Sequence, residues 1–212
     1  NPKEKLFDVA IMMDCSQCPI HPKLKAVFTD YAKKNSEIVR AKGARPVFFM
    51  SWAYADKPEM TAQLAEAYTV AGNENNALVI PAGLAFARAI QKQPELNLYA
   101  PDKRHPSLAG TYLATSVVFA ALTGRSPVSN PYIAGIDAPT AAFLQNVAWE
   151  TVQEYYGKCQ SIAHDRPFGS RHEMRRRDIL AGLGQPAGLP PPALAPPPAA
   201  ALPPRRLPGC RP

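Results

Sequence analysis

Short apolar runs alternate along this chain with longer stretches in which apolar residues recur every three or four positions. The apolar runs occupy residues 5–13, 46–52 and 77–81, and each suits a strand that is buried on both faces of a parallel sheet. Helical spacing follows them at residues 22–42, 58–75, 84–91, 107–122 and 139–156. Strands and helices that alternate through short connections predict an α/β fold in three layers, with helices on both faces of a parallel sheet.

The predicted helices have recognisable ends and apolar positions. Gly43 and Gly124 follow two of them as C-caps. The first helix is defined by apolar positions among lysines: Leu24, Val27, Phe28, Tyr31, Ile38 and Val39. In the last helix, Trp149 is interpreted as an apolar anchor rather than a substrate contact.

The residues that follow each predicted strand are the first candidates for a binding site. In open parallel sheets, ligands bind beyond the carboxyl ends of the strands. These positions are residues 14–19, 52–56 and 81–83. A long loop ahead of the helix at 107–122 brings Asp102 and His105 to the same edge.

The segment from Asp102 to Ser107 carries the clearest chemical signal. An aspartate three residues before a histidine can orient the imidazole and stabilise its protonated form, which is the base half of a serine hydrolase. Pro106 and Ser107 are typical of a helix start. The alternative interpretation is a plain helix N-terminus, with Asp102 as a solvated turn residue and His105 partly packed.

Four segments together resemble the SGNH (GDSL-type) hydrolase family, over residues 7–156. They read PVFFMSWAY at 46–54, PEMT at 58–61, ALVIPAGLAF at 77–86 and HPSLAGTYL at 105–113. The resemblance implies a flavodoxin-like α/β/α domain in which Asp102 and His105 complete a catalytic triad. The family serine belongs to an N-terminal block that this chain lacks, so we expect an incomplete domain.

The resemblance also implies a Gln-Glu-Gln-Ser-like run at residues 13–16 that lines the site and helps to bind the oxyanion. Ser16 and the following Gln17 agree with the family, whereas Met13, Asp14 and Cys15 depart from it. A methionine side chain cannot donate a hydrogen bond to an oxyanion. Ser16, Gln17 and Trp52 are therefore the candidate substrate and oxyanion contacts.

Three serines are candidate nucleophiles. Ser16 follows a strand, but only about two and a half strand–helix units separate it from Asp102, so it is interpreted as a site-lining residue. Ser51 is less suited, and Ser107 is interpreted as a helix cap beside His105.

The resemblance implies an esterase or acyl hydrolase that acts on small-molecule, glycan or lipid esters, without cofactor or metal. Without its serine, this chain should be close to inactive. One alternative is a noncatalytic binding module that keeps the crevice and a wall made of Trp52 and Tyr54.

A Cys15-x-x-Cys18 motif between a strand and a helix supports a second alternative, a thiol-redox protein. The motif lacks a preceding aromatic residue, and a thioredoxin-like fold does not account for Asp102 and His105. A metal bound by Cys15, Cys18 and His21 would need a further ligand. Incidental cysteines are the favoured interpretation.

Composition separates a folded part, residues 1–160, from a Pro/Arg/Ala-rich tail, residues 161–212, which is predicted to be disordered. Residues 165–212 hold eight arginines and three acidic residues, so most of the net charge of +7 belongs to the tail. Few aromatic residues accompany these arginines, which argues against a nucleic-acid partner. The tail's proline clusters are interpreted as an extension rather than a partner ligand.

No apolar run is long enough to span a membrane. Because the chain opens on Asn1 rather than methionine, its first residues carry no information on compartment, and cytoplasmic and extracytoplasmic locations are both compatible with the sequence.

Overall fold

The computed structural model describes residues 5–159. The predicted tail at 161–212 lies outside these residues. Strands and helices alternate, and the described part ends with three successive helices. The elements are β1 (Val9–Met12), η1 (Cys18–Ile20), α1 (Lys25–Ala41), β2 (Arg45–Phe49), α2 (Met60–Glu74), β3 (Leu78–Ile80), α3 (Ala82–Lys92), α4 (Leu108–Thr123) and α5 (Ala138–Cys159).

The three described strands form one parallel sheet in the order β1-β2-β3. Ile11 pairs with Val47, and Val47 in turn pairs with Leu78. All three strands therefore run in the same direction, and their carboxyl ends meet at one edge.

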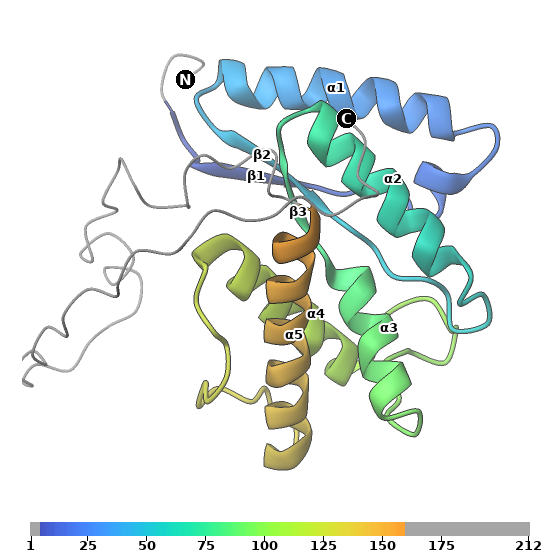
Figure 1. The fold of residues 1–212 in the computed structure, drawn as a ribbon, viewed down its shortest axis with the longest axis vertical. Helices are drawn as coiled ribbons and strands as arrows, with labels where there is room; N and C mark the ends of the chain where they lie inside the picture. The colour runs from blue at the N-terminus through green and yellow to red at the C-terminus, as the bar shows by residue number, and fades with distance from the viewer. Residues whose placement is uncertain (1–4, 160–212) are drawn as a thin grey trace, which may run out of the picture. The chain divides into compact units, whose positions relative to one another are not determined.

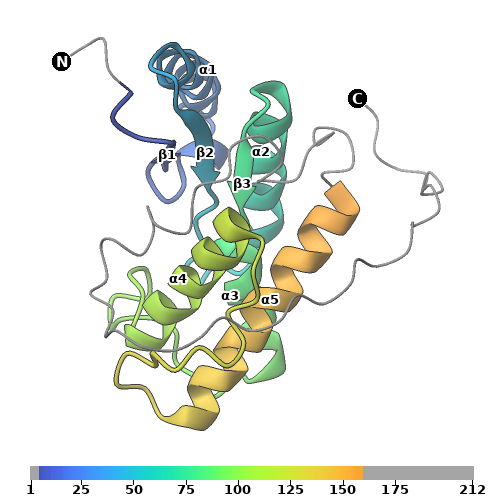
Figure 2. The same cartoon turned by 90° about the vertical axis from the view of Figure 1, so that its left-hand side faces the viewer.

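Helices cover both faces of this sheet (Figures 1 and 2). On one face, Phe48 and Val79 pack with buried residues of α1 and α2, such as Phe28 and Leu64. On the other face, Val47 and Ile80 pack with α3, α4 and α5. The predicted three-layer α/β/α fold is confirmed.

The prediction that the first strand is buried on both faces is wrong. Ile11 is 48% exposed and Met13, just beyond the strand, is 62% exposed. The reason is the position of β1 at the margin of the sheet: within residues 5–159 it pairs only with β2. Burial on both faces holds for β3, whose three residues are all buried.

The buried face of α1 also differs from the apolar pattern that predicts the helix. Its buried residues are Phe28, Ala32 and Ser36, which follow one another at intervals of four. Apolar residues on its outer side remain exposed: Leu24, Val27, Tyr31 and Ile38. The pattern thus predicts the helix, but of its apolar positions only Phe28 is among the buried residues.

Candidate active site

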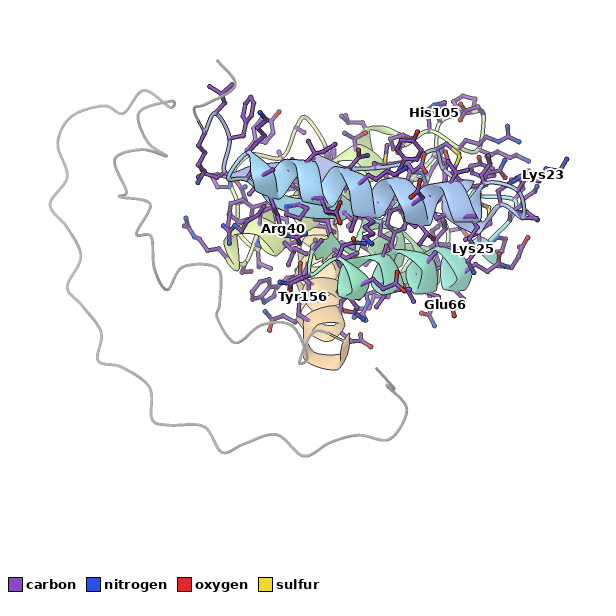
Figure 3. The ribbon with its side chains drawn as sticks, turned by 90° about the horizontal axis from the view of Figure 1, so that it is seen from above. Lys23, Lys25, Arg40, Glu66, His105 and Tyr156 are labelled. Atoms are coloured by element: carbon purple, nitrogen blue, oxygen red, sulfur yellow. A yellow bond between two sulfur atoms is a disulfide. The ribbon has the colours of Figure 1, made fainter. Side chains whose placement is uncertain are left out.

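Asp102 and His105 lie on a loop that closes just before α4. The amide of Ala100 donates to the His105 carbonyl over 2.8 Å, and the amide of Ser107 donates to the Leu98 carbonyl over 2.9 Å. Tyr99 and Pro106 form an isolated antiparallel bridge between these bonds. The loop therefore has a narrow base, and His105 projects at one end of the molecule (Figure 3).

The carboxylate of Asp102 organises this loop from within. Its Oδ1 accepts the amide hydrogens of Arg104, over 3.0 Å, and of His105, over 2.9 Å. Its Oδ2 contacts Nδ1 of the His105 ring. Lys103, between Asp102 and Arg104 in the chain, adopts a left-handed φ of 63°, which the tight turn imposes. The bonds within this turn therefore align the carboxylate with the imidazole.

The pKa of the Asp102 carboxyl lies well below its ordinary value. The largest cause is the hydrogen bond with the His105 ring, followed by the backbone amides of Arg104 and His105. The Asp102 side chain is 47% exposed and that of His105 is 79% exposed. An ionised carboxylate thus holds Nδ1 of an imidazole whose ring is open to solvent.

Residues 98–107 form the loop that carries His105, here called the histidine loop, and the loop between β2 and α2 supports it. The indole Nε1 of Trp52 donates to the Arg104 carbonyl over 2.9 Å, and the amide of Ala55 donates to the Lys103 carbonyl over 3.0 Å. The buried hydroxyl of Tyr99 donates to the Ala53 carbonyl over 2.8 Å. Burial raises the pKa of Tyr99 to about 12, so this hydroxyl keeps its proton.

Trp52 is itself fixed by packing. Its ring stacks on Phe86 with centroids 4.4 Å apart and planes 9° apart. Gly83, in the first turn of α3, allows the backbone of Ser51 to come close, because a Cβ there would lie 2.2 Å from the Ser51 carbonyl oxygen. Trp52, a candidate substrate contact in the sequence, therefore also positions the loop that carries His105.

The start of α4 agrees with its predicted capping. The Ser107 hydroxyl accepts from the Gly110 amide over 3.2 Å and donates to the Asn97 carbonyl over 2.9 Å. A Cβ on Gly110 would lie 2.2 Å from the Leu98 carbonyl oxygen. This close approach sets the base of the histidine loop against the helix.

The loop after β1 lies at the same edge as β2's carboxyl end. The buried Ser51 donates its hydroxyl to the Ser16 carbonyl over 3.3 Å. Ser16 and Gln17 are exposed, and the Gln17 carbonyl accepts from the Ile20 amide over 3.0 Å. Of the three serines considered as nucleophiles, Ser51 and Ser107 thus use their hydroxyls in structural hydrogen bonds.

Cys15 and Cys18 are joined by a disulfide. The Asp14 carboxylate lies close to both sulfurs, with all three candidate ligand atoms within 4.8 Å of one another. The disulfide leaves neither sulfur as the thiolate that a metal requires. The third ligand considered from sequence, His21, instead accepts the Lys23 amide at its Nδ1 over 3.2 Å.

Several supporting residues could not be identified from the sequence. Tyr99 and Ala55 contact residues about 46 and 48 positions away in the chain, and no motif marks them. Arg104 lies over the Tyr54 ring, 4.8 Å from its centroid, which gives a role to the aromatic residue of the predicted wall. No helix in the part of the chain that the structure describes is long and apolar enough to cross a membrane.

Fold and loop together define an α/β protein that presents a carboxylate–imidazole pair beside the carboxyl edge of a parallel sheet. No protein-family model and no curated protein matches the chain. Among solved structures, it is similar to a DUF4886 family protein from Bacteroides uniformis, with a TM-score of 0.57 and 22% identity over 69% of this chain and 62% of that one. The chain thus spans less than two thirds of that protein.

A second solved structure, a Slackia heliotrinireducens protein provisionally assigned as an SGNH hydrolase, is 27% identical over 54% of this chain and 65% of that one, with a TM-score of 0.48. The α/β fold with a parallel sheet that the sequence predicts is confirmed, and the Bacteroides uniformis protein shares it.

Proposed function

We propose that this chain carries the general-base half of an SGNH-type serine hydrolase that acts on ester or related acyl bonds. The observation that supports this most is the contact of the Asp102 carboxylate with Nδ1 of His105. It leaves Nε2, the other ring nitrogen, available to take a proton from a nucleophile.

In the proposed reaction, a serine hydroxyl attacks the acyl carbonyl carbon while Nε2 of His105 takes its proton. Asp102 stabilises the imidazolium that forms, and His105 then returns the proton to the leaving alcohol. The resemblance assigns this serine to an N-terminal block of the family domain. Ser16 and Gln17 would line the oxyanion side of the site, and small-molecule, glycan or lipid esters are the proposed substrates.

The proposal can be tested on the chain as it stands, because an oriented imidazole can also activate water. We expect slow hydrolysis of p-nitrophenyl acetate that falls to the uncatalysed rate in His105→Ala. Asp102→Asn should lower the rate as well, since it removes the charge that stabilises the imidazolium. The matched control is His21→Ala, which removes a histidine outside the loop and should leave the rate unchanged.

A fluorophosphonate probe separates the remaining possibilities. Labelling that disappears in both Ser16→Ala and His105→Ala would identify Ser16 as the nucleophile and correct its proposed role. A hydrolysis rate that is equal in the unmodified chain and in His105→Ala would contradict the proposal and favour a noncatalytic binding module.

A further inference from the structure

The disulfide after β1 is short-range and accessible on one side. Cys15 and Cys18 are three residues apart, with a Cα–Cα distance of 5.2 Å. Cys15 is exposed, whereas Cys18 is half-buried next to the buried Pro19. We propose that this disulfide is a site of reversible thiol–disulfide exchange, at which a small dithiol attacks the sulfur of Cys15.

The backbone around the disulfide is held by bonds that do not depend on it. The amide of Cys18 donates to the Cys15 carbonyl over 3.1 Å, and the amide of His21 donates to the Cys18 carbonyl over 3.3 Å. Reduction therefore leaves the two thiols close together, and their high effective concentration favours closure again. So short a ring also restricts the unfolded chain less than a long-range disulfide would. These features suit a bond that opens and closes in the folded protein.

The proposed step conserves electrons and protons. A thiolate of the dithiol attacks Cys15 Sγ, and the electron pair of the broken S–S bond leaves on Cys18 Sγ, which takes a proton. The second thiolate of the reductant then attacks the other sulfur of the reductant, the one that is bonded to Cys15 in the mixed disulfide. Cys15 is released and protonated, and the reductant leaves as a cyclic disulfide, so that two electrons and two protons pass to the cysteine pair.

Asp14 slows this exchange. Its Oδ1 accepts the Cys15 amide over 2.7 Å, and its carboxylate lies within 4.8 Å of both sulfurs. Attack by a thiolate brings negative charge to these sulfurs, and the carboxylate opposes it. A full negative charge 4.8 Å from the carboxylate corresponds to about a fourfold reduction in rate at the dielectric constant of water.

The exchange site is linked to the candidate active site through the backbone. The carbonyl of Ser16, between the two cysteines, accepts a hydrogen bond from the Ser51 hydroxyl. Trp52, which follows Ser51 in the chain, donates to the Arg104 carbonyl. Two hydrogen bonds thus connect the Cys15–Cys18 loop, through Ser51 and Trp52, with the loop that carries His105.

The experiment follows the reduction of the folded full chain by dithiothreitol, with alkylation by a maleimide and peptide mapping by mass spectrometry. Mapping separates the peptide that holds Cys15 and Cys18 from Cys159 and Cys210. We expect this peptide to gain two labels with time and to lose its reactivity again after oxidised dithiothreitol is added. Asp14→Asn, which keeps the acceptor oxygen, should be reduced about fourfold faster.

Asp30→Asn is the matched control, since it removes a carboxylate on α1 that pairs with Lys34 and should leave the rate unchanged. Cys15→Ser should give a single label that does not depend on the reductant. The proposal is overturned if both cysteines react before any reductant is added, if reduction requires urea, or if the reduced pair does not close again. Equal rates for Asp14→Asn and the unmodified chain would remove the role of Asp14.

Discussion

The two sides of the molecule bury their apolar residues to very different extents. Where α3, α4 and α5 pack on the sheet, Phe86, Leu113 and Leu144 are at most 1% exposed. Where β1 and α1 form the other margin, Val27 is 49% exposed and Tyr31 is 55% exposed. Both sides are rich in apolar residues, so the difference arises from which neighbours each element has.

The backbone of β1 shows the same contrast. The Arg45 amide donates to the Asp8 carbonyl, so Asp8 faces β2. Because successive residues of a strand direct their amide and carbonyl groups to opposite sides, those of Val9 and Ile11 face away from the sheet. An apolar pattern therefore predicts an element, whereas its burial depends on what lies beside it.

The largest expected effect is on the closed side of the molecule, where α3, α4 and α5 pack on the sheet. The other side, formed by β1 and α1, is called the open side. Phe86→Ala should lower the free energy of unfolding by about 3–5 kcal/mol, because it opens a cavity in the core and removes the ring under Trp52. Urea denaturation measures this change. The matched control is Phe7→Ala, since Phe7 is 71% exposed on the open side and should change stability by less than about 0.5 kcal/mol. Equal losses in the two variants would contradict the contrast.

A smaller loss is expected at the close approach between α3 and β2's carboxyl end. Gly83→Ala should cost about 1–3 kcal/mol, because the added methyl group would overlap the Ser51 carbonyl oxygen. Thermal unfolding measures the loss. In Gly157→Ala the new methyl group meets no atom within 4 Å, and this change in α5 should be neutral or stabilise by about 0.5–1 kcal/mol. A stable Gly83→Ala protein would show that the two backbones can separate without cost.

The smallest change in folding stability is expected on the open side. Replacing Val27 and Tyr31 together by serine should alter the free energy of unfolding by less than about 1 kcal/mol, since both side chains are largely exposed already. The same variant should self-associate less in static light scattering, because a smaller apolar surface remains accessible. A large loss of stability would show that these side chains are buried in solution.

The sequence predicted all of the main strands and helices because their signals are local. The C-caps Gly43 and Gly124 do adopt positive φ, as helix ends of this kind require. The packed face of α1 could not be predicted in the same way. Ala32 and Ser36 are buried there although neither is strongly apolar, and their burial depends on the sheet and α2 rather than on α1 itself.

The same distinction applies to the candidate site. Asp102 and His105 are three residues apart, and their contact follows from one turn that the sequence already specifies. Trp52 was singled out for its place after a strand, but its bond to Arg104 spans 52 positions. Such long-range bonds depend on the whole α/β framework, and no local pattern encodes them. The catalytic roles of these residues stay predictions until the hydrolysis experiment is done.

The packing of Trp52 has a practical consequence for spectroscopy. The chain has two tryptophans, and the other, Trp149, packs against the α3–α5 core. An indole that stacks on Phe86 and bonds to the Arg104 carbonyl should change its emission whenever the histidine loop shifts. With Trp149 replaced by phenylalanine, the protein would carry a single intrinsic fluorophore at the rim of its own candidate active site.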